Sequence, residues 1–298
     1  TVLSLQDFEI FCMQTHLVRR NGRFCEDSDG GRNCAMYCLP RAKRLRVRAA
    51  APLSPIFGED ADTTYLRGVI RNRRTAFSRI DNVLFASEYV LNRYASEGFK
   101  TNNSRLIELG IPRFEARMRP DPKPPLRFVF IGNINHEKGV DLLLDVFSGI
   151  DEDEAILELH GGSISKDIKP MLEAALRKKG NIKHKGKYND GDLPEILSGA
   201  DCVLNPTRRH ETFSLVLSEA WMAGAPVIAA ASGAVATRVT NGVDGLLFKP
   251  GDKRELSSLI RKLIDDPSEI IRLRSGIREV MTIDKYYEEI KKIYTGED

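Results

Sequence analysis

From residue 126 onward, short apolar segments alternate with longer amphipathic ones, and this alternation constrains the fold more than any other feature of the sequence. The apolar segments, which we expect to be buried strands, are 126–132, 155–161, 181–188, 201–206, 226–231 and 245–252. The amphipathic segments, which we expect to be helices, are 140–150, 168–180, 192–200, 214–224 and 255–266. Alternation at this spacing is typical of stacked β-α-β units, so we predict an α/β fold with a parallel sheet.

A proline-rich segment, Arg119–Pro125, separates this regular region from the residues before it. Four of its seven residues are proline, which excludes a helix or a central strand and predicts a stiff linker. A chain of 298 residues is long enough for about two domains. We therefore expect one domain over 1–122 and a second over 123–283.

Composition and charge exclude several classes of protein. Apolar residues make up 42% and charged residues 29%, which is ordinary for a globular protein and excludes wholesale disorder. Residues 1–122 hold 20 Lys and Arg against 14 Asp and Glu, whereas the remainder holds 25 against 28. Because nucleic-acid binding needs a much stronger basic patch, we expect no nucleic-acid partner.

Neither a membrane span nor a signal peptide is predicted. The apolar runs are far shorter than the about 20 residues that a transmembrane helix needs. The first residues lack a basic region and include Asp7 and Glu9, unlike a signal peptide. We therefore expect a cytoplasmic protein, and the missing initiator Met suggests a fragment or a processed chain.

Two basic segments, 41–48 and 67–79, lie in the first region. Around the second, Leu66, Ile70 and Phe77 recur at near-helical spacing, which favours a helix with one solvated basic face. The alternative is peripheral contact with phosphates or with a membrane surface, which would place the protein at the inner membrane face.

Four of the five cysteines crowd into 27 positions with the spacing C-x12-C-x8-C-x3-C; they are Cys12, Cys25, Cys34 and Cys38. The last gap is compatible with zinc, and a tetrahedral thiolate site would order the loop-like residues between them. A reduced, exposed loop and a disulfide pair are the alternatives. Cys202 lies in an apolar stretch and is expected to be a buried thiol.

Parallel sheets bind ligands where their strands end, beside helix N-termini, so the loops after the strands are the candidate site. After the first predicted strand, Gly132 and Asn133 lead to Lys138, just before the next helix. Glycine lets the backbone approach a ligand closely, and a lysine beside a helix start suits a phosphate. Gly161 follows the second strand, within a glycine pair that suits either a ligand or a simple turn.

The most informative loop follows the strand that ends near residue 205. It delivers Glu211 just ahead of a helix, where the free N–H groups of Phe213, Ser214 and Leu215 would bind an anion or sugar hydroxyls. Glu219 lies among apolar residues one turn into that helix, and a ribose diol would be a natural partner for its carboxylate. Residue types alone favour the alternative, an exposed glutamate on an amphipathic helix.

These loops carry a family resemblance. Residues 127–252 resemble the C-terminal domain of the family-4, or group 1, glycosyltransferases with the GT-B fold. The central match is Glu211-x7-Glu219, followed by Gly-Ala-Pro-Val at 224–227. In the first region, SLQDFEIFC resembles the family's strand that ends in His-Asp, and NVLFASEYV resembles its Ser-Glu strand–helix turn. The resemblance covers most of the chain.

The resemblance implies two Rossmann-like domains, the N-terminal one incomplete, and a helix over 284–298 that returns to the first domain. The second domain would hold a nucleotide-diphosphate sugar. Lys138 would contact the diphosphate, and Glu211, with the amides of residues 213–215, would hold the donor sugar. Glu219 would bind the ribose, and Tyr188 would lie near the base.

The implied reaction moves a hexosyl group to an acceptor hydroxyl, on a glycan or a lipid-linked molecule, with retention of configuration. No metal or other cofactor is required, because the leaving diphosphate takes the acceptor proton. Positive charge at Lys138 and the helix dipoles would stabilise that leaving group. Such a reaction belongs to cell-envelope glycan biosynthesis.

Three residues depart from the family pattern. Asn133 stands where the family usually has Arg, Gln6 where it has a sugar-contacting His, and Ser214 where it has Gly. Almost nothing precedes SLQDF, so we expect an incomplete acceptor side. Two alternatives stay open: a non-catalytic or truncated nucleotide-sugar-binding protein, and an epimerase or phosphorylase of the same fold.

Overall fold

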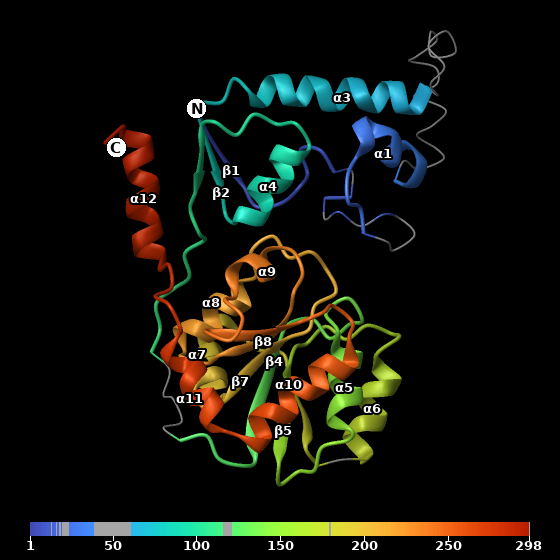
Figure 1. Ribbon diagram of the computed structural model, residues 1–298, viewed down its shortest axis with the longest axis vertical. Helices are drawn as coiled ribbons and strands as arrows, with labels where there is room; N and C mark the ends of the chain where they lie inside the picture. Colours follow the sequence, from blue (N-terminus) through green and yellow to red (C-terminus); the bar gives the residue numbers. More distant parts are fainter. Residues whose placement is uncertain are drawn as a thin grey trace. The chain divides into compact units, whose positions relative to one another are not determined.

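The computed structural model describes residues 1–12, 14, 15, 17, 19, 24–38, 61–115, 121–178 and 180–297. The chain divides into two compact units, Thr1–Glu108 with Lys292–Asp298, and Leu109–Lys291 (Figure 1). The sequence placed the division at residue 122, after the first prolines. It falls earlier because Ile111 already belongs to the second unit, where its N–H donates to the Met281 carbonyl at 3.1 Å and its carbonyl accepts from Ile283 at 2.9 Å.

The second unit contains a six-stranded sheet in the order β6-β5-β4-β7-β8-β9, with every neighbouring pair parallel. This confirms the predicted α/β fold. Its strands are β4 (Leu126–Ile131), β5 (Ala155–His160), β6 (Ile182–Gly186), β7 (Cys202–Asn205), β8 (Val227–Ala230) and β9 (Gly245–Phe248). The order reverses direction at β4, so the carboxyl ends of β4, β5 and β7 form a topological switch point.

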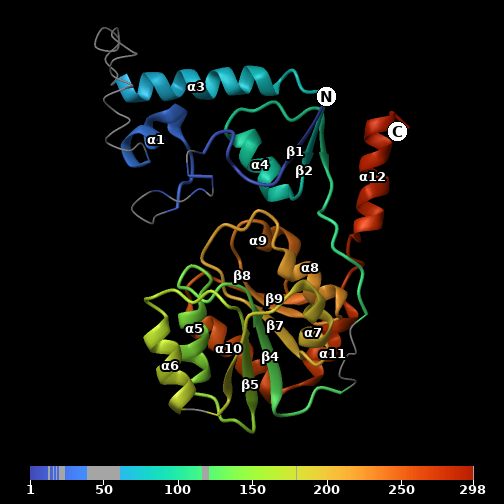
Figure 2. The ribbon, with the colours of Figure 1, turned by 180° about the vertical axis from the view of Figure 1, so that it is seen from behind.

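Helices cover both faces of this sheet, as the apolar strands require. They are α5 (Val140–Phe147), α6 (Lys169–Lys178), α7 (Leu193–Leu197), α8 (Leu215–Met222), α9 (Ala234–Arg238), α10 (Lys253–Asp265) and α11 (Ser268–Ser275), with α12 (Ile283–Thr295) at the end of the chain. A short 3-10 helix, η3 (Asp190–Asp192), precedes α7. Figures 1 and 2 show α5 and α10 on one side of the sheet and α7 and α8 on the other.

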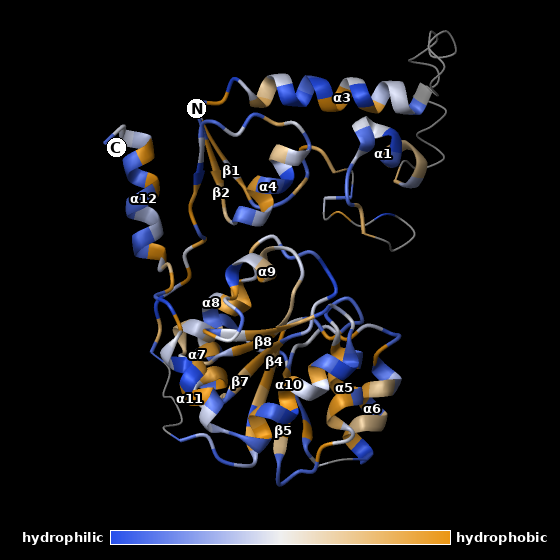
Figure 3. Cartoon of the chain, in the orientation of Figure 1, coloured by the Kyte–Doolittle hydropathy of each residue, from blue (hydrophilic) through white to orange (hydrophobic). Residues whose placement is uncertain are grey.

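Alternation along β4 explains how one strand serves two cores. Leu126, Phe128 and Phe130 join the cluster that packs under α5, α6, α10 and α11. Val129 and Ile131 join the cluster that packs under α7 and α8. Since successive side chains of a strand point to opposite faces, a strand covered on both faces reads as a continuous apolar run. Figure 3 shows the strands of this sheet as the most hydrophobic part of the unit.

The first unit has a three-stranded parallel sheet in the order β1-β2-β3. Its elements are β1 (Val2–Leu5), η1 (Asp29–Gly31), α1 (Arg32–Tyr37), α3 (Ala61–Phe77), β2 (Asn82–Phe85), α4 (Glu88–Ser96) and β3 (Ser104–Leu106). Tyr94 lies at the centre of its core, in contact with the rings of Phe8, Phe11 and Phe99. The Tyr94 hydroxyl donates to the Asp7 carbonyl at 3.1 Å, which ties the end of β1 to α4.

Residues 67–77 of the basic segment 67–79 lie on α3, and the helical prediction is confirmed for them. Leu66, Ile70 and Phe77 are buried, whereas Arg71 and Arg73 are exposed. The other basic segment, 41–48, lies outside the described residues. Within the described part of the chain, no helix combines the length and the apolar character needed to cross a membrane.

Gly139, directly before α5, allows two loops of the second unit to touch. Its φ is +75°, and an added Cβ would lie 2.1 Å from the Pro206 carbonyl oxygen. We expect Gly139→Ala to lower the free energy of unfolding by about 2 kcal/mol or more, because both the backbone conformation and the contact resist a side chain. Urea denaturation measures this change.

Gly191→Ala is the matched control, because nothing lies within 4 Å of its added Cβ. Its unfolding free energy should change by no more than about 0.5 kcal/mol. Equal destabilisation by the two substitutions would contradict the role given to Gly139.

Candidate functional site

Three loops of the second unit meet where β4, β5 and β7 end. Residues Ile131 and His160 lie opposite each other at the ends of β4 and β5. The loop after β4 is tied to the loop after β5, because the Ile134 N–H donates to the Ser163 carbonyl at 2.8 Å. It is tied to the loop after β7 by the Arg208 N–H, which donates to the Glu137 carbonyl at 2.8 Å. The predicted site loops are therefore brought together.

Two glycines allow the first two loops to approach this closely. Gly132 has a φ of +140°, a conformation that a side chain disfavours. Gly161 faces it, and an added Cβ at Gly161 would lie 2.0 Å from the Gly132 carbonyl oxygen. Both glycines thus serve the contact between loops. Asn133, the next residue, is exposed.

Lys138 and Glu211 form an ion pair at the centre of these loops. The Lys138 Nζ donates to Glu211 Oε1 at 2.6 Å, and the side chains are 31% and 19% exposed. The Thr207 hydroxyl donates to the same carboxylate oxygen at 3.3 Å. The sequence predicted each residue for the site but not their contact, since nothing in the spacing of 138 and 211 indicates it.

Asn133 stands where the family usually has an arginine, and Arg208 does not replace that positive charge. Arg208 donates through both Nη atoms to the two Asp141 carboxylate oxygens, at 2.6 and 2.8 Å. It also donates to the His136 carbonyl at 2.6 Å. A two-point pair of this kind holds a guanidinium in a fixed orientation. Lys138 is therefore the cation that adjoins Glu211.

The start of α8 lies beside Glu211. Its N-cap, Ser214, has a φ of +68° and a ψ of 87°, and its side chain makes no capping hydrogen bond. Instead, the Ser214 hydroxyl accepts from Asn205 Nδ2 at 3.0 Å. N–H groups of a first helical turn have no acceptor within the helix and carry the positive end of its dipole. The start of α8 can therefore donate to an anion or to hydroxyl groups.

Glu219 lies on α8 and is partly exposed, which differs from the alternative of a freely exposed glutamate that residue types alone favoured. Burial, together with the charge of Asp190, raises the pKa of Glu219 to about 6. Burial also raises the pKa of Tyr188, with smaller contributions from Glu219 and Asp190. The charges of Tyr188, Asp190 and Glu219 therefore influence one another, and we call these three residues the acidic cluster. A hydrogen-bond donor placed at this carboxylate would offset the cost of its burial.

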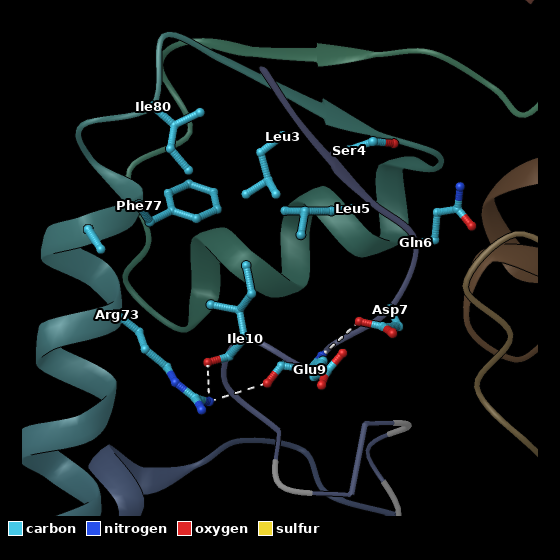
Figure 4. Close-up of a pocket in the computed structure, with 11 residues that line it drawn as sticks. Leu3, Ser4, Leu5, Gln6, Asp7, Glu9, Ile10, Arg73, Phe77 and Ile80 are labelled. Carbon is cyan, nitrogen blue, oxygen red and sulfur yellow. Dashed lines mark hydrogen bonds between the residues drawn. The ribbon is translucent and has the colours of Figure 1, made fainter. Parts of the chain in front are cut away.

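Gln6, the predicted sugar-side residue of the first unit, follows β1 and is exposed. It lies at one end of a groove of about 650 Å³ (Figure 4). The groove walls are mainly apolar and include Leu3, Ile10 and Phe77. Arg73 crosses the groove and donates to the Ile10 carbonyl at 2.8 Å. Figure 4 shows the Gln6 side chain turned away from the apolar end.

The cysteines predicted to hold zinc lie in the first unit. Cys12, Cys34 and Cys38 are buried, Cys25 is partly buried, and all are free thiols. Burial raises the pKa of the Cys34 thiol to about 12, with smaller contributions from Cys38, Cys25 and Cys12. Among the residues that the structure describes, no group of three or more His, Cys, Asp or Glu is arranged to hold a metal. The zinc site stays a prediction from spacing. Cys202 is fully buried, as predicted.

A family model described as "Glycosyl transferases group 1" matches residues 114–280. The chain is 28% identical over 189 residues to the D-inositol 3-phosphate glycosyltransferase of Thermomonospora curvata, covering 59% of this chain and 44% of that protein. It is 28% identical over 180 residues to sulfoquinovosyl transferase SQD2 of Arabidopsis thaliana, covering 55% and 34%. The chain thus matches less than half the length of these curated relatives.

Solved structures share the fold. The complex of Anabaena Alr3699/HepE with UDP and glucose aligns with a TM-score of 0.63 and 18% identity, covering 76% of this chain and 67% of that chain. Sucrose-phosphate synthase from Thermosynechococcus elongatus aligns with a TM-score of 0.64 and 20% identity, covering 78% and 61%. The parallel sheets and these alignments identify the GT-B fold that the resemblance implied.

The raised pKa of Glu219 predicts a cost to stability. A buried carboxyl whose pKa is raised from 4.5 to about 6 destabilises the folded state above pH 6 and stops doing so as the pH falls towards 4.5. We expect Glu219→Gln to raise the free energy of unfolding at pH 8 by about 1–2 kcal/mol. Chemical denaturation across this pH range measures the gain, which should shrink below pH 6.

Glu173→Gln provides the control, because Glu173 is an exposed glutamate on α6. It should leave the unfolding free energy within about 0.5 kcal/mol at each pH. A Glu219→Gln protein that is less stable than the parent at pH 8 would show that the carboxylate is well accommodated.

Proposed function

This chain belongs to the group 1 glycosyl transferases, and from that membership we propose that it transfers a hexosyl group from a nucleoside-diphosphate sugar to an acceptor hydroxyl. The observation that carries the proposal is the contact of Lys138 with Glu211 beside the start of α8. A cation, a carboxylate and unpaired amides at one point can bind a sugar attached to a diphosphate.

The diphosphate would bind at Lys138, and the donor sugar at Glu211 and the amides at the start of α8. In the free protein the Lys138 ammonium is neutralised by Glu211. An incoming diphosphate would compete for that ammonium and would release the Glu211 carboxylate to accept hydrogen bonds from sugar hydroxyls. One ion pair is thus exchanged for another, so the loops need not hold an excess of positive charge before the donor arrives.

The nucleoside would bind at the acidic cluster of Tyr188, Asp190 and Glu219. A ribose diol can donate two hydrogen bonds to one carboxylate, which would offset the burial that raises the pKa of Glu219. The Tyr188 ring would offer a flat surface for a base, and the charge of Glu219 contributes to the raised pKa of this tyrosine. Because the Anabaena protein was solved with UDP, we take uridine as the first nucleoside to test.

The proposed chemical step needs no side-chain base. The bond between the sugar anomeric carbon and the diphosphate oxygen breaks, and a bond from that carbon to the acceptor oxygen forms on the same face. The acceptor proton passes to the departing phosphate oxygen, so configuration is retained and charge is balanced. Lys138 and the dipole of α8 would stabilise the negative charge on the leaving group. This step requires no metal.

On the acceptor side, we propose a carbohydrate or lipid-linked hydroxyl in cell-envelope glycan synthesis. The exposed arginines of α3 suit a phosphorylated or membrane-bound acceptor at the inner face of a membrane. Gln6 would lie on the sugar side in place of the family's histidine. Gln6 and Asn133 also favour a second candidate, a protein that binds the donor without turning it over.

Titration calorimetry with UDP, GDP and ADP tests donor binding. We expect one nucleotide class to bind. We expect Lys138→Ala to weaken binding of the nucleoside diphosphate by about 10–100-fold and to leave binding of the free nucleoside unchanged, because the lysine would contact only phosphate. Lys166→Ala is the control, since Lys166 is an exposed lysine of the same unit. Equal weakening of diphosphate and nucleoside would contradict the role of Lys138.

Glu219→Ala tests the ribose contact in the same assay. We expect about tenfold weaker UDP binding, and no further loss when UDP is replaced by 2′,3′-dideoxy-UDP, because the lost hydroxyls are the partners of the carboxylate. Release of UDP from UDP-glucose then separates a transferase from a binding protein. Failure of every nucleotide to bind would overturn the proposed function.

A further inference from the structure

Arg238, the last residue of α9, reaches under the start of α8. It is 5% exposed, and its Nη1 donates to the carbonyls of both Phe213 and Ser214, at 2.9 and 3.0 Å. Its Nη2 donates to the Ser218 hydroxyl at 2.9 Å. Its guanidinium lies 3.6 Å from the centre of the Phe213 ring. One buried cation therefore holds two consecutive peptide groups of the loop that enters α8.

The direction of these two carbonyls fixes the direction of two amides. In a trans peptide group the C=O and N–H bonds point in opposite directions. The Phe213 carbonyl belongs to the same peptide as the Ser214 N–H, and the Ser214 carbonyl to the same peptide as the Leu215 N–H. Since both carbonyls point at Arg238, both N–H groups point away from it. They are two of the three amides expected to contact the donor sugar.

Arg238 holds the turn at Ser214, where a serine disfavours the backbone conformation. Ser214 has a φ of +68°, a left-handed conformation that costs a non-glycine residue free energy. Glycine would adopt this turn without help, but it would also leave the turn freer to change. Hydrogen bonds from a rigid planar guanidinium select one arrangement of the two peptides. The serine side chain adds a second restraint through Asn205.

We propose that Arg238 is a positioning residue that aims the Ser214 and Leu215 amides at the donor sugar. The proposal rests on the proposed donor site and adds a residue that contacts no substrate itself. It predicts that loss of the guanidinium affects recognition of the sugar more than recognition of the nucleotide. Lysine cannot replace it, because a single ammonium lacks the planar fork of donors.

The test compares UDP-glucose with UDP in parent, Arg238→Met and Arg238→Lys proteins by titration calorimetry. Methionine keeps much of the apolar stem and removes the guanidinium. We expect Arg238→Met to weaken UDP-glucose by about tenfold or more and UDP by less than about threefold, with Arg238→Lys between the parent and the methionine variant. The readout is the ratio of the affinities for UDP-glucose and UDP. If the methionine variant does not fold, this ratio is measured with Arg238→Lys.

Leu273→Ala is the control for stability alone. Leu273 is fully buried on α11 and packs in the core on the opposite face of the sheet from α8. We expect it to lower the melting temperature and to leave the affinity ratio unchanged. An Arg238 variant that weakens both ligands equally, or neither, would overturn the positioning role. A parent protein that binds neither these ligands nor GDP nor ADP would instead overturn the proposed function, so the two failures are distinguishable.

Discussion

The parallel pairing of β4 with β5 on one side and β7 on the other is the constraint on which the site depends. Because β4 is the strand where the sheet order reverses, the loops after these strands leave the same edge and turn toward different faces. The loops can then come into close contact only if no side chain lies between their backbones. Gly132, Gly139 and Gly161 meet this requirement, each at a contact that a Cβ would obstruct or a φ that it would strain.

Charge compensation organises the same loops. Lys138 pairs with Glu211, Arg208 with Asp141 and Arg209 with Glu137. Partly exposed pairs of this kind contribute little stability individually. These ion pairs therefore chiefly orient the side chains. The relative position of the loops is set by the backbone hydrogen bond from Arg208 to Glu137 and by the close contact at Gly139. The loops are consequently fixed by backbone contacts, while the single contact of Lys138 with Glu211 remains exchangeable.

The strands and most helices of the second unit could be predicted because each carries a clear local pattern. Helix α9 could not, since five residues are too few to establish a helical period. Arg238 was missed for the same reason, and because its partners lie about 20–25 residues away, where only the turn of the chain brings them together. The division of the chain was placed too late, because prolines indicate where a segment is stiff and not which unit it packs against.

Among the candidate site residues, Glu211 and Glu219 were predicted from their motif, but the environment of each came only from the structure. Glu219 is partly buried in the structure, whereas residue types alone favoured an exposed glutamate. The contact between Lys138 and Glu211 depends on two loops whose lengths and glycines allow it. Local patterns thus identify the residue types, whereas long-range packing decides their charge partners.

Helix α8 concentrates two unfavourable features at one site. Ser214 adopts a left-handed turn, and Glu219 keeps a carboxyl group where burial opposes its charge. Hydrogen bonds from Arg238 and Asn205 hold the turn at Ser214. Folded proteins retain such costs where a ligand recovers them, since strained and desolvated groups bind without further reorganisation. The position of both features on one helix, beside a cation and a second carboxylate, is therefore best explained by a ligand that spans the start and the first turns of α8.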